Sequence, residues 1–148
     1  MAVRAGTFTL DPDTGRLLIR TSRTGLAARA GHDLLIEVTR WSARVEVPES
    51  GDPAGATITA EIDLSSLAVR EGTGGVKPLT DADRADIHRT VRKILPRDGT
   101  VARFRSSRVI ATAGGGAIEG SVELNGKSQP VRLQLTELTP ARYQGSAT

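Results

Sequence analysis

The segment from residue 118 to residue 135 constrains the fold more than any other, because it has the pattern of a β-hairpin. Apolar residues alternate with polar ones on both sides of Asn125-Gly126. These two residues tolerate the positive φ angles that a tight two-residue turn requires. After the turn, Val131 and Leu133 resume the alternation against Arg132 and Gln134. The segment therefore predicts two antiparallel strands with one apolar face and one polar face.

The same two-faced pattern recurs along most of the chain. Alternation and turn residues predict strands at residues 8–10, 16–21, 34–39, 42–47, 57–62, 101–110, 118–124, 130–136 and 141–146. The polar turn at residues 11–15 is typical of a hairpin connection, so we expect the first two strands to pair with each other.

The period changes to that of a helix only between residues 80 and 95. Thr80 is a suitable N-cap, and Ile87, Val91 and Ile94 fall on one stripe. Pro96 then ends the segment. One amphipathic helix is therefore expected among about eight or nine strands. This combination predicts a mainly β fold, a single antiparallel barrel or sandwich that spans residues 1–148 as one domain.

Composition excludes several classes of function. The net charge is only +3, acidic and basic residues are interspersed, and there is no Cys. These features do not indicate a nucleic-acid partner, a disulfide framework or thiol chemistry. There is no apolar run of membrane-spanning length and no signal-peptide pattern after Met1. We therefore expect a cytoplasmic protein, or a periplasmic or secreted one if a leader has been removed.

The sequence lacks the patterns of common catalytic and cofactor sites. The two histidines, His32 and His88, are too few for a His-based catalytic zinc site, and neither belongs to a pair with metal-ligand spacing, so no metal site is expected. Gly72 to Lys77 lacks the residues of a phosphate-binding loop, so no cofactor is expected. His32 and Asp33 leave open a small hydrolase or isomerase. A hydrogen-bonded turn is the simpler interpretation of the same pair, and we expect no enzyme.

Four segments together resemble the YceI-like family of polyisoprenoid-binding proteins. Phe8 to Pro12 resembles the opening strand and turn of that family, and residues 57–67, which contain Asp63-Leu64-Ser65-Ser66-Leu67, resemble its central strand and Ser-containing corner. Residues 101–106 are similar to the strand that carries its Phe-x-Ser signature, and residues 118–133 to its Gly-x-Leu, turn-Gly and Pro-Val strand pair.

The resemblance implies a lipocalin-like barrel that binds a long isoprenoid lipid in its interior, such as a polyprenyl chain, a quinone or a prenyl phosphate. A barrel of about eight strands is wide enough to hold one ligand. Alternation and the helical stripe select the candidate ligand-binding residues. These are Leu17, Ile19, Leu34, Ile36, Val38, Val45, Ile58, Ile62, Ile87, Val91, Ile94, Phe104, Ile118, Val122, Leu124, Val131, Leu133 and Leu135.

The chain departs from the family pattern in two ways. The aromatic pair that the family often carries after its helix region is replaced by aliphatic residues. The family also usually continues to a closing strand, whereas this sequence ends at Thr148. Either the sequence is shortened or the barrel is incomplete. If this chain is all that folds, we expect an open sheet edge near Tyr143, and a homodimer that covers this edge by strand pairing or through a symmetric patch. A protein-interaction module with a filled barrel is the alternative to a lipid carrier.

Overall fold

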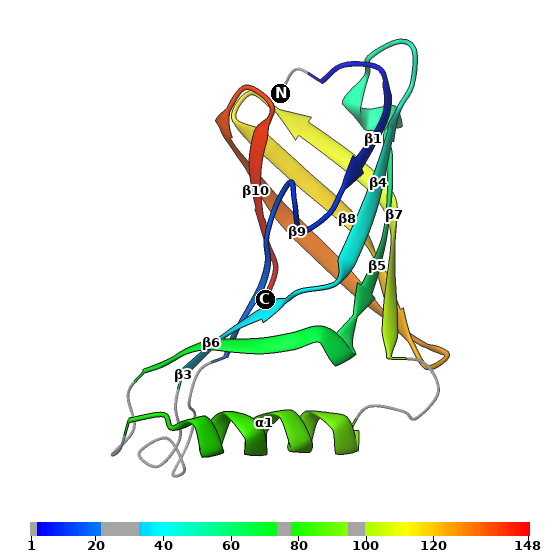
Figure 1. Cartoon of the computed structure of the whole chain (residues 1–148). Coiled ribbons are helices and arrows are strands. Elements are labelled where there is room, and N and C mark those ends of the chain that lie inside the picture. Colours follow the sequence, from blue (N-terminus) through cyan, green and yellow to red (C-terminus); the bar gives the residue numbers. More distant parts are fainter. Residues whose placement is uncertain (1–2, 22–32, 74–77, 95–99) are drawn as a thin grey trace. The chain divides into compact units, whose positions relative to one another are not determined.

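A computed structural model of the chain describes residues 3–21, 33–73, 78–94 and 100–148. Within these residues the fold is mainly β, with one α-helix and two short 3-10 helices (Figure 1). In chain order the elements are β1 (Gly6–Leu10), β2 (Leu17–Thr21), β3 (Asp33–Val38), β4 (Trp41–Val47), η2 (Pro53–Gly55), β5 (Thr57–Asp63), η3 (Leu64–Ser66), β6 (Leu67–Thr73), α1 (Asp81–Ile94), β7 (Val101–Thr112), β8 (Gly115–Leu124), β9 (Lys127–Thr139) and β10 (Arg142–Ser146).

The strands form two sheets. A curled antiparallel sheet has seven strands in the order β1-β4-β5-β7-β8-β9-β10, and a smaller sheet has the order β2-β3-β6 (Figure 1). The predicted mainly β, lipocalin-like architecture with one helix is confirmed. Sequence patterning missed one strand, β6, which pairs in antiparallel fashion with β3.

The chain folds into two compact units, and each unit combines segments that are far apart in the sequence. The first unit comprises Met1–Leu10, Ser42–Glu61 and Ala102–Thr148. The second comprises Asp11–Trp41 and Ile62–Val101. The first unit holds most of the seven-stranded sheet, and the second holds the three-stranded sheet and α1.

The prediction that the first two strands form a hairpin is wrong. β1 pairs with β4 over all five of its residues, from Gly6↔Val47 to Leu10↔Ala43, whereas β2 pairs with β3. The turn between them does form, since the backbone N–H of Thr14 donates to the carbonyl of Asp11 at 3.0 Å. Local residues form the turn, but they do not decide which strand becomes the partner, because pairing depends on residues distant in the sequence.

The hairpin of β8 and β9 forms as the sequence predicts. Asn125 and Gly126 have φ angles of 53° and 75°, and the pairing closes at Leu124↔Lys127. Pro130 is accommodated inside β9 opposite Ser121. The pairing of β9 with β10 covers only residues 134–139, so the missing N–H of Pro130 removes no bond from that ladder.

Helix α1 begins where the sequence predicts. The backbone N–H of Asp83 donates to the Thr80 hydroxyl at 3.1 Å, and the backbone N–H of Thr80 donates to the Asp83 carboxylate at 2.9 Å. This reciprocal pair is a capping box, with Asp in the place of the usual Glu or Gln. Among the described residues, no helix is long and apolar enough to cross a membrane.

Candidate functional site

The first unit carries an apolar cluster on one face of the curled sheet. Phe104, Val109 and Ile118 are buried at its centre. Partly buried apolar residues pack around them, namely Ala56, Ile58, Ala60, Val122, Val131, Leu133 and Leu135. These ten residues, which we call the apolar face, come from strands β5, β7, β8 and β9 and from the residue that precedes β5.

Strand register explains why these side chains meet. Phe104 lies opposite Val122 across β7 and β8, and Ile118 lies opposite Leu133 across β8 and β9. Directly opposite residues in an antiparallel pair place their side chains on the same face of the sheet. The alternation in each strand therefore brings the apolar residues together once the pairing is set.

Gly120 gives the Phe104 ring the space that it occupies. A Cβ atom at position 120 would lie 2.7 Å from Cζ of Phe104 and 2.3 Å from the carbonyl oxygen of Arg105. Both distances are far below van der Waals contact, so only glycine fits here without a shift of the ring and of the neighbouring strand. The Phe104 ring thus lies against the backbone of β8 at Gly120.

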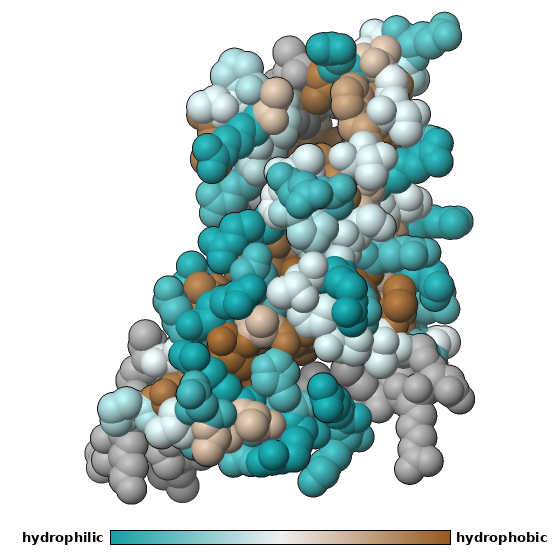
Figure 2. All heavy atoms as spheres, in the orientation of Figure 1, coloured by the Kyte–Doolittle hydropathy of each residue, from teal (hydrophilic) through white to brown (hydrophobic). Residues whose placement is uncertain are grey.

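The aliphatic residues that surround the buried centre of the apolar face are only half-buried. Val122, Val131, Leu133 and Leu135 retain intermediate exposure. In the part of the chain that the structure describes, the only side chain below 2% exposure is that of Val38, in the second unit. Figure 2 shows patches of apolar surface between polar side chains on the side of the molecule in view. The apolar face therefore retains hydrophobic area that a ligand can cover.

The opposite face of the same sheet carries charged side chains in pairs. Arg132 contacts Glu119 at 2.8 Å, and Arg44 contacts Glu46 at 2.9 Å. All four side chains are at least one-third exposed. Such exposed pairs contribute little to stability, about 0–1 kcal/mol each. They do identify this face as the solvated side of the sheet.

The candidate residues from the sequence divide between the two units. The apolar face contains seven of them, which are Ile58, Phe104, Ile118, Val122, Val131, Leu133 and Leu135. Val45 and Leu124 also belong to the first unit and are half-buried. The second unit holds Leu17, Ile19, Leu34, Ile36, Val38, Ile62, Ile87, Val91 and Ile94.

In the second unit, Val38 and Ile36 are the best buried of the candidates, at 1% and 7% exposure. They lie opposite Leu17 and Ile19 of β2. Ile19 itself is 36% exposed. Val91 and Ile94 lie in α1, but their side chains are outside the described part of the structure.

Sequence alternation missed Val109, a central residue of the apolar face. In β7, the buried residue Phe104 has an even number and the buried residue Val109 has an odd one, so strict alternation would place their side chains on opposite faces of the sheet. The register of β7 against β8 shifts between Ser106 and Arg108, and such a bulge moves the inward phase by one residue. Bulges have little local sequence signal, so simple alternation could not assign Val109 to this face.

A polar cluster in the second unit surrounds Asp63. Its carboxylate accepts hydrogen bonds from the Ser65 hydroxyl at 2.6 Å, from the Arg40 guanidinium at 3.0 Å and from the Thr100 hydroxyl at 3.2 Å. The hydrogen bond from Ser65 is the main reason why the pKa of Asp63 is lowered, and Arg40 adds to it. Asp63 also caps η3 by accepting from the backbone N–H of Ser65. The cluster fixes the corner between β5 and β6.

Two serine hydroxyls, those of Ser66 and Ser106, make structural hydrogen bonds. The Ser66 hydroxyl donates to the carbonyl of Asp63 at 2.7 Å, and the Ser106 hydroxyl accepts from the backbone N–H of Ile58 at 2.8 Å. Asp33 is half-buried in β3, and His32 lies outside the described residues. The catalytic alternative based on His32 and Asp33 therefore stays a prediction.

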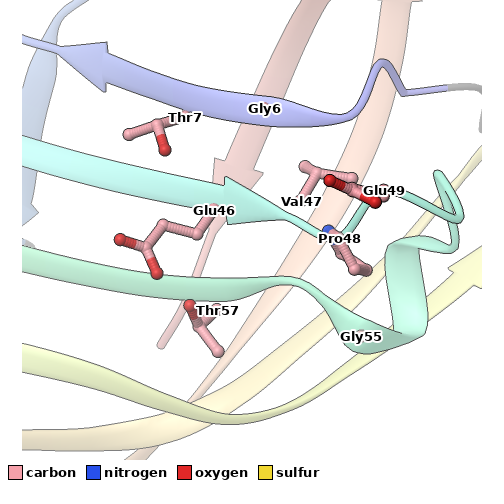
Figure 3. Close-up of a pocket in the computed structure, with 8 residues that line it drawn as sticks. All are labelled: Gly6, Thr7, Glu46, Val47, Pro48, Glu49, Gly55 and Thr57. Carbon is pink, nitrogen blue, oxygen red and sulfur yellow. The ribbon is translucent and has the colours of Figure 1, made fainter.

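A shallow surface hollow of about 520 Å³ lies where β1, β4 and β5 come together in the first unit (Figure 3). Its lining residues are Gly6, Thr7, Glu46, Val47, Pro48, Glu49, Gly55 and Thr57, none of which is a predicted ligand-binding residue. Across the described residues, no group of three or more His, Asp or Glu side chains is placed to hold a metal ion.

No model of a known protein family matches the sequence, and no curated protein matches it either. The resemblance to YceI-like proteins depends on four short segments and stays a prediction. Three of those segments lie on β5, β7 and the β8–β9 hairpin, the strands that carry the apolar face.

Proposed function

We propose that this protein binds a long-chain isoprenoid lipid without chemical conversion, and so carries or sequesters it. The apolar face of the curled sheet would hold the lipid tail. The observation that carries this proposal is the partial exposure of the aliphatic residues on that face, which are clustered but not covered.

Physical chemistry favours an extended apolar ligand on such a surface. Covering apolar area contributes about 25 cal/mol per Å², and branched aliphatic side chains offer no directional polar contact. A polyprenyl tail is long and methyl-branched, so it gains affinity from area alone. The protein strands that resemble polyisoprenoid-binding proteins are those that form this face, which supports the same ligand class.

The test substitutes Leu133, which lies on the apolar face opposite Ile118. Leu133→Arg places a guanidinium where the tail would lie, and an unpaired charge there is costly. We expect this variant to retain about one tenth or less of the prenyl quinone or prenyl phosphate that the wild-type protein retains. A tenfold loss of affinity corresponds to about 1.4 kcal/mol in the free energy of binding. Native mass spectrometry after incubation with each lipid, followed by solvent extraction, measures the retained amount.

Gln134→Arg is the matched control, because Gln134 is the exposed neighbour on the other face of the same strand. It should retain lipid like the wild type. If Leu133→Arg is shown by circular dichroism to be unfolded, the isosteric Val122→Thr replaces it and should weaken binding several-fold. Equal lipid retention in the wild type and in a folded apolar-face variant would overturn the proposed site.

Absence of lipid binding by the wild-type protein would overturn the proposed function itself. The protein-interaction module would then be the better interpretation, since large apolar side chains at the surface also suit a protein partner.

A further inference from the structure

The two end strands of the seven-stranded sheet differ in how they are protected against pairing. The sheet ends in β1 on one side and β10 on the other. β10 begins with Arg142 and has a register shift between Arg142 and Tyr143. A charge and a bulge are two devices by which proteins block the edge of a sheet.

β1 has neither device. Its sequence, Gly-Thr-Phe-Thr-Leu, contains no charge and no proline, and its pairing with β4 is regular throughout. All five residues are exposed, and the large apolar side chains Phe8 and Leu10 are 38% and 40% exposed. Among the described strands, only β4 pairs with β1, so its other edge can accept a strand.

The pattern around Phe8 is self-complementary. Thr7 and Thr9 flank Phe8 symmetrically, and on β4 they lie opposite Glu46 and Arg44. An antiparallel pair of two β1 strands, with a two-fold axis at Phe8, would place Thr7 of one copy opposite Thr9 of the other. Each such row would then have Glu46 at one end and Arg44 of the second copy at the other. In each of the two rows, the two threonines therefore lie between a negative charge from one copy and a positive charge from the other.

We propose that β1 is a dimerisation edge, and that its occupant is the β1 strand of a second copy of this chain, paired antiparallel about Phe8. The partner strand joins the two seven-stranded sheets and brings the two Phe8 side chains together. Aromatic and Thr–Thr cross-strand pairs favour this arrangement. Since a five-residue strand buries little area, the dimer is expected to dissociate in the micromolar range. This inference does not depend on lipid binding.

The position of the two-fold axis can be tested with two double variants that differ at one residue. Both carry Thr7→Lys, which is tolerated in the monomer because Glu46 lies opposite (Figure 3). In T7K/T9K, lysines oppose each other in both rows, and we expect the dissociation constant of the dimer to be at least about tenfold higher than that of the wild type. In T7K/T9E, lysine opposes glutamate in both rows, and the dimer should be at least as tight as the wild type.

Sedimentation velocity of the full chain, from about 1 to about 100 µM, measures the dissociation constant. Gln144→Lys on β10 is the matched edge control and should leave dimerisation unchanged. If circular dichroism shows that T7K/T9K is unfolded, Phe8→Lys replaces it, because two lysines then oppose each other at the proposed two-fold axis and Phe8 is exposed in the monomer. The dissociation constant of this variant should be at least about tenfold higher than that of T7K/T9E, and equal constants would overturn the proposal. A wild-type monomer over the whole range, or two double variants that dimerise equally, would overturn the proposal.

Discussion

At the scale of single residues, the contact between Phe104 and Gly120 shows how closely the apolar face depends on side-chain volume. Phe104 is buried at 7% exposure, and its ring fills the space beside the backbone of β8. The sequence alone identifies Gly120 as an apolar-face position of an alternating strand. It does not show that a ring must lie against it, because that contact is made across two strands.

Gly120→Ala is therefore expected to destabilise the protein by about 1–3 kcal/mol, since the added methyl group overlaps Phe104 and the Arg105 carbonyl. Urea unfolding monitored by circular dichroism gives the free energy. Gly114→Ala is the control, because a Cβ atom there meets nothing within 4 Å. Equal stability of the two variants would show that the sheet relaxes around position 120.

At the scale of elements, local chemistry determined what formed and where it ended. The Asn125-Gly126 turn and the Thr80 cap are both present as predicted. The prediction of a β1–β2 hairpin was wrong, and strand β6 was not predicted. Both features depend on the choice of a partner strand that is distant in the sequence. Elements with their own start and stop residues are thus more predictable than their pairing.

Thr80→Ala should cost about 1 kcal/mol of stability, because it removes the acceptor for the backbone N–H of Asp83. We expect a lower helical circular dichroism signal and an earlier urea midpoint. Thr80→Ser keeps the hydroxyl and should behave like the wild type. If alanine and serine at this position give the same midpoint, the cap does not contribute to stability.

At the scale of the whole molecule, two carboxylates link stability to pH. Hydrogen bonds from Arg16 and Arg70 lower the pKa of Glu37 below its ordinary 4.5, and the Ser65 hydroxyl is the main cause of the lowered pKa of Asp63, ordinarily 3.8. A lowered folded-state pKa means that the unfolded chain binds protons first as the pH falls. The stabilisation is thus complete above about pH 5 and decreases as the pH falls through the lowered values.

We predict that the free energy of unfolding falls below about pH 4.5 and that Asp63→Asn reduces this pH dependence. Urea titrations at several pH values measure it in both proteins. Ser65→Ala provides a matched variant, because it removes the hydrogen bond that contributes most to the lowered pKa of Asp63. An acid dependence identical in all three proteins would contradict this account.

The sequence by itself determined the mainly β architecture, helix α1, the β8–β9 hairpin and seven residues of the apolar face. Alternation, turn residues and caps are local, so they can be read without knowing what lies opposite. Only the tertiary structure decided that β1 pairs with β4, that a bulge places Val109 beside Phe104, and that the candidate residues divide between two units. These features depend on which distant strands meet and in which register, and a shift of one residue moves every side chain to the other face.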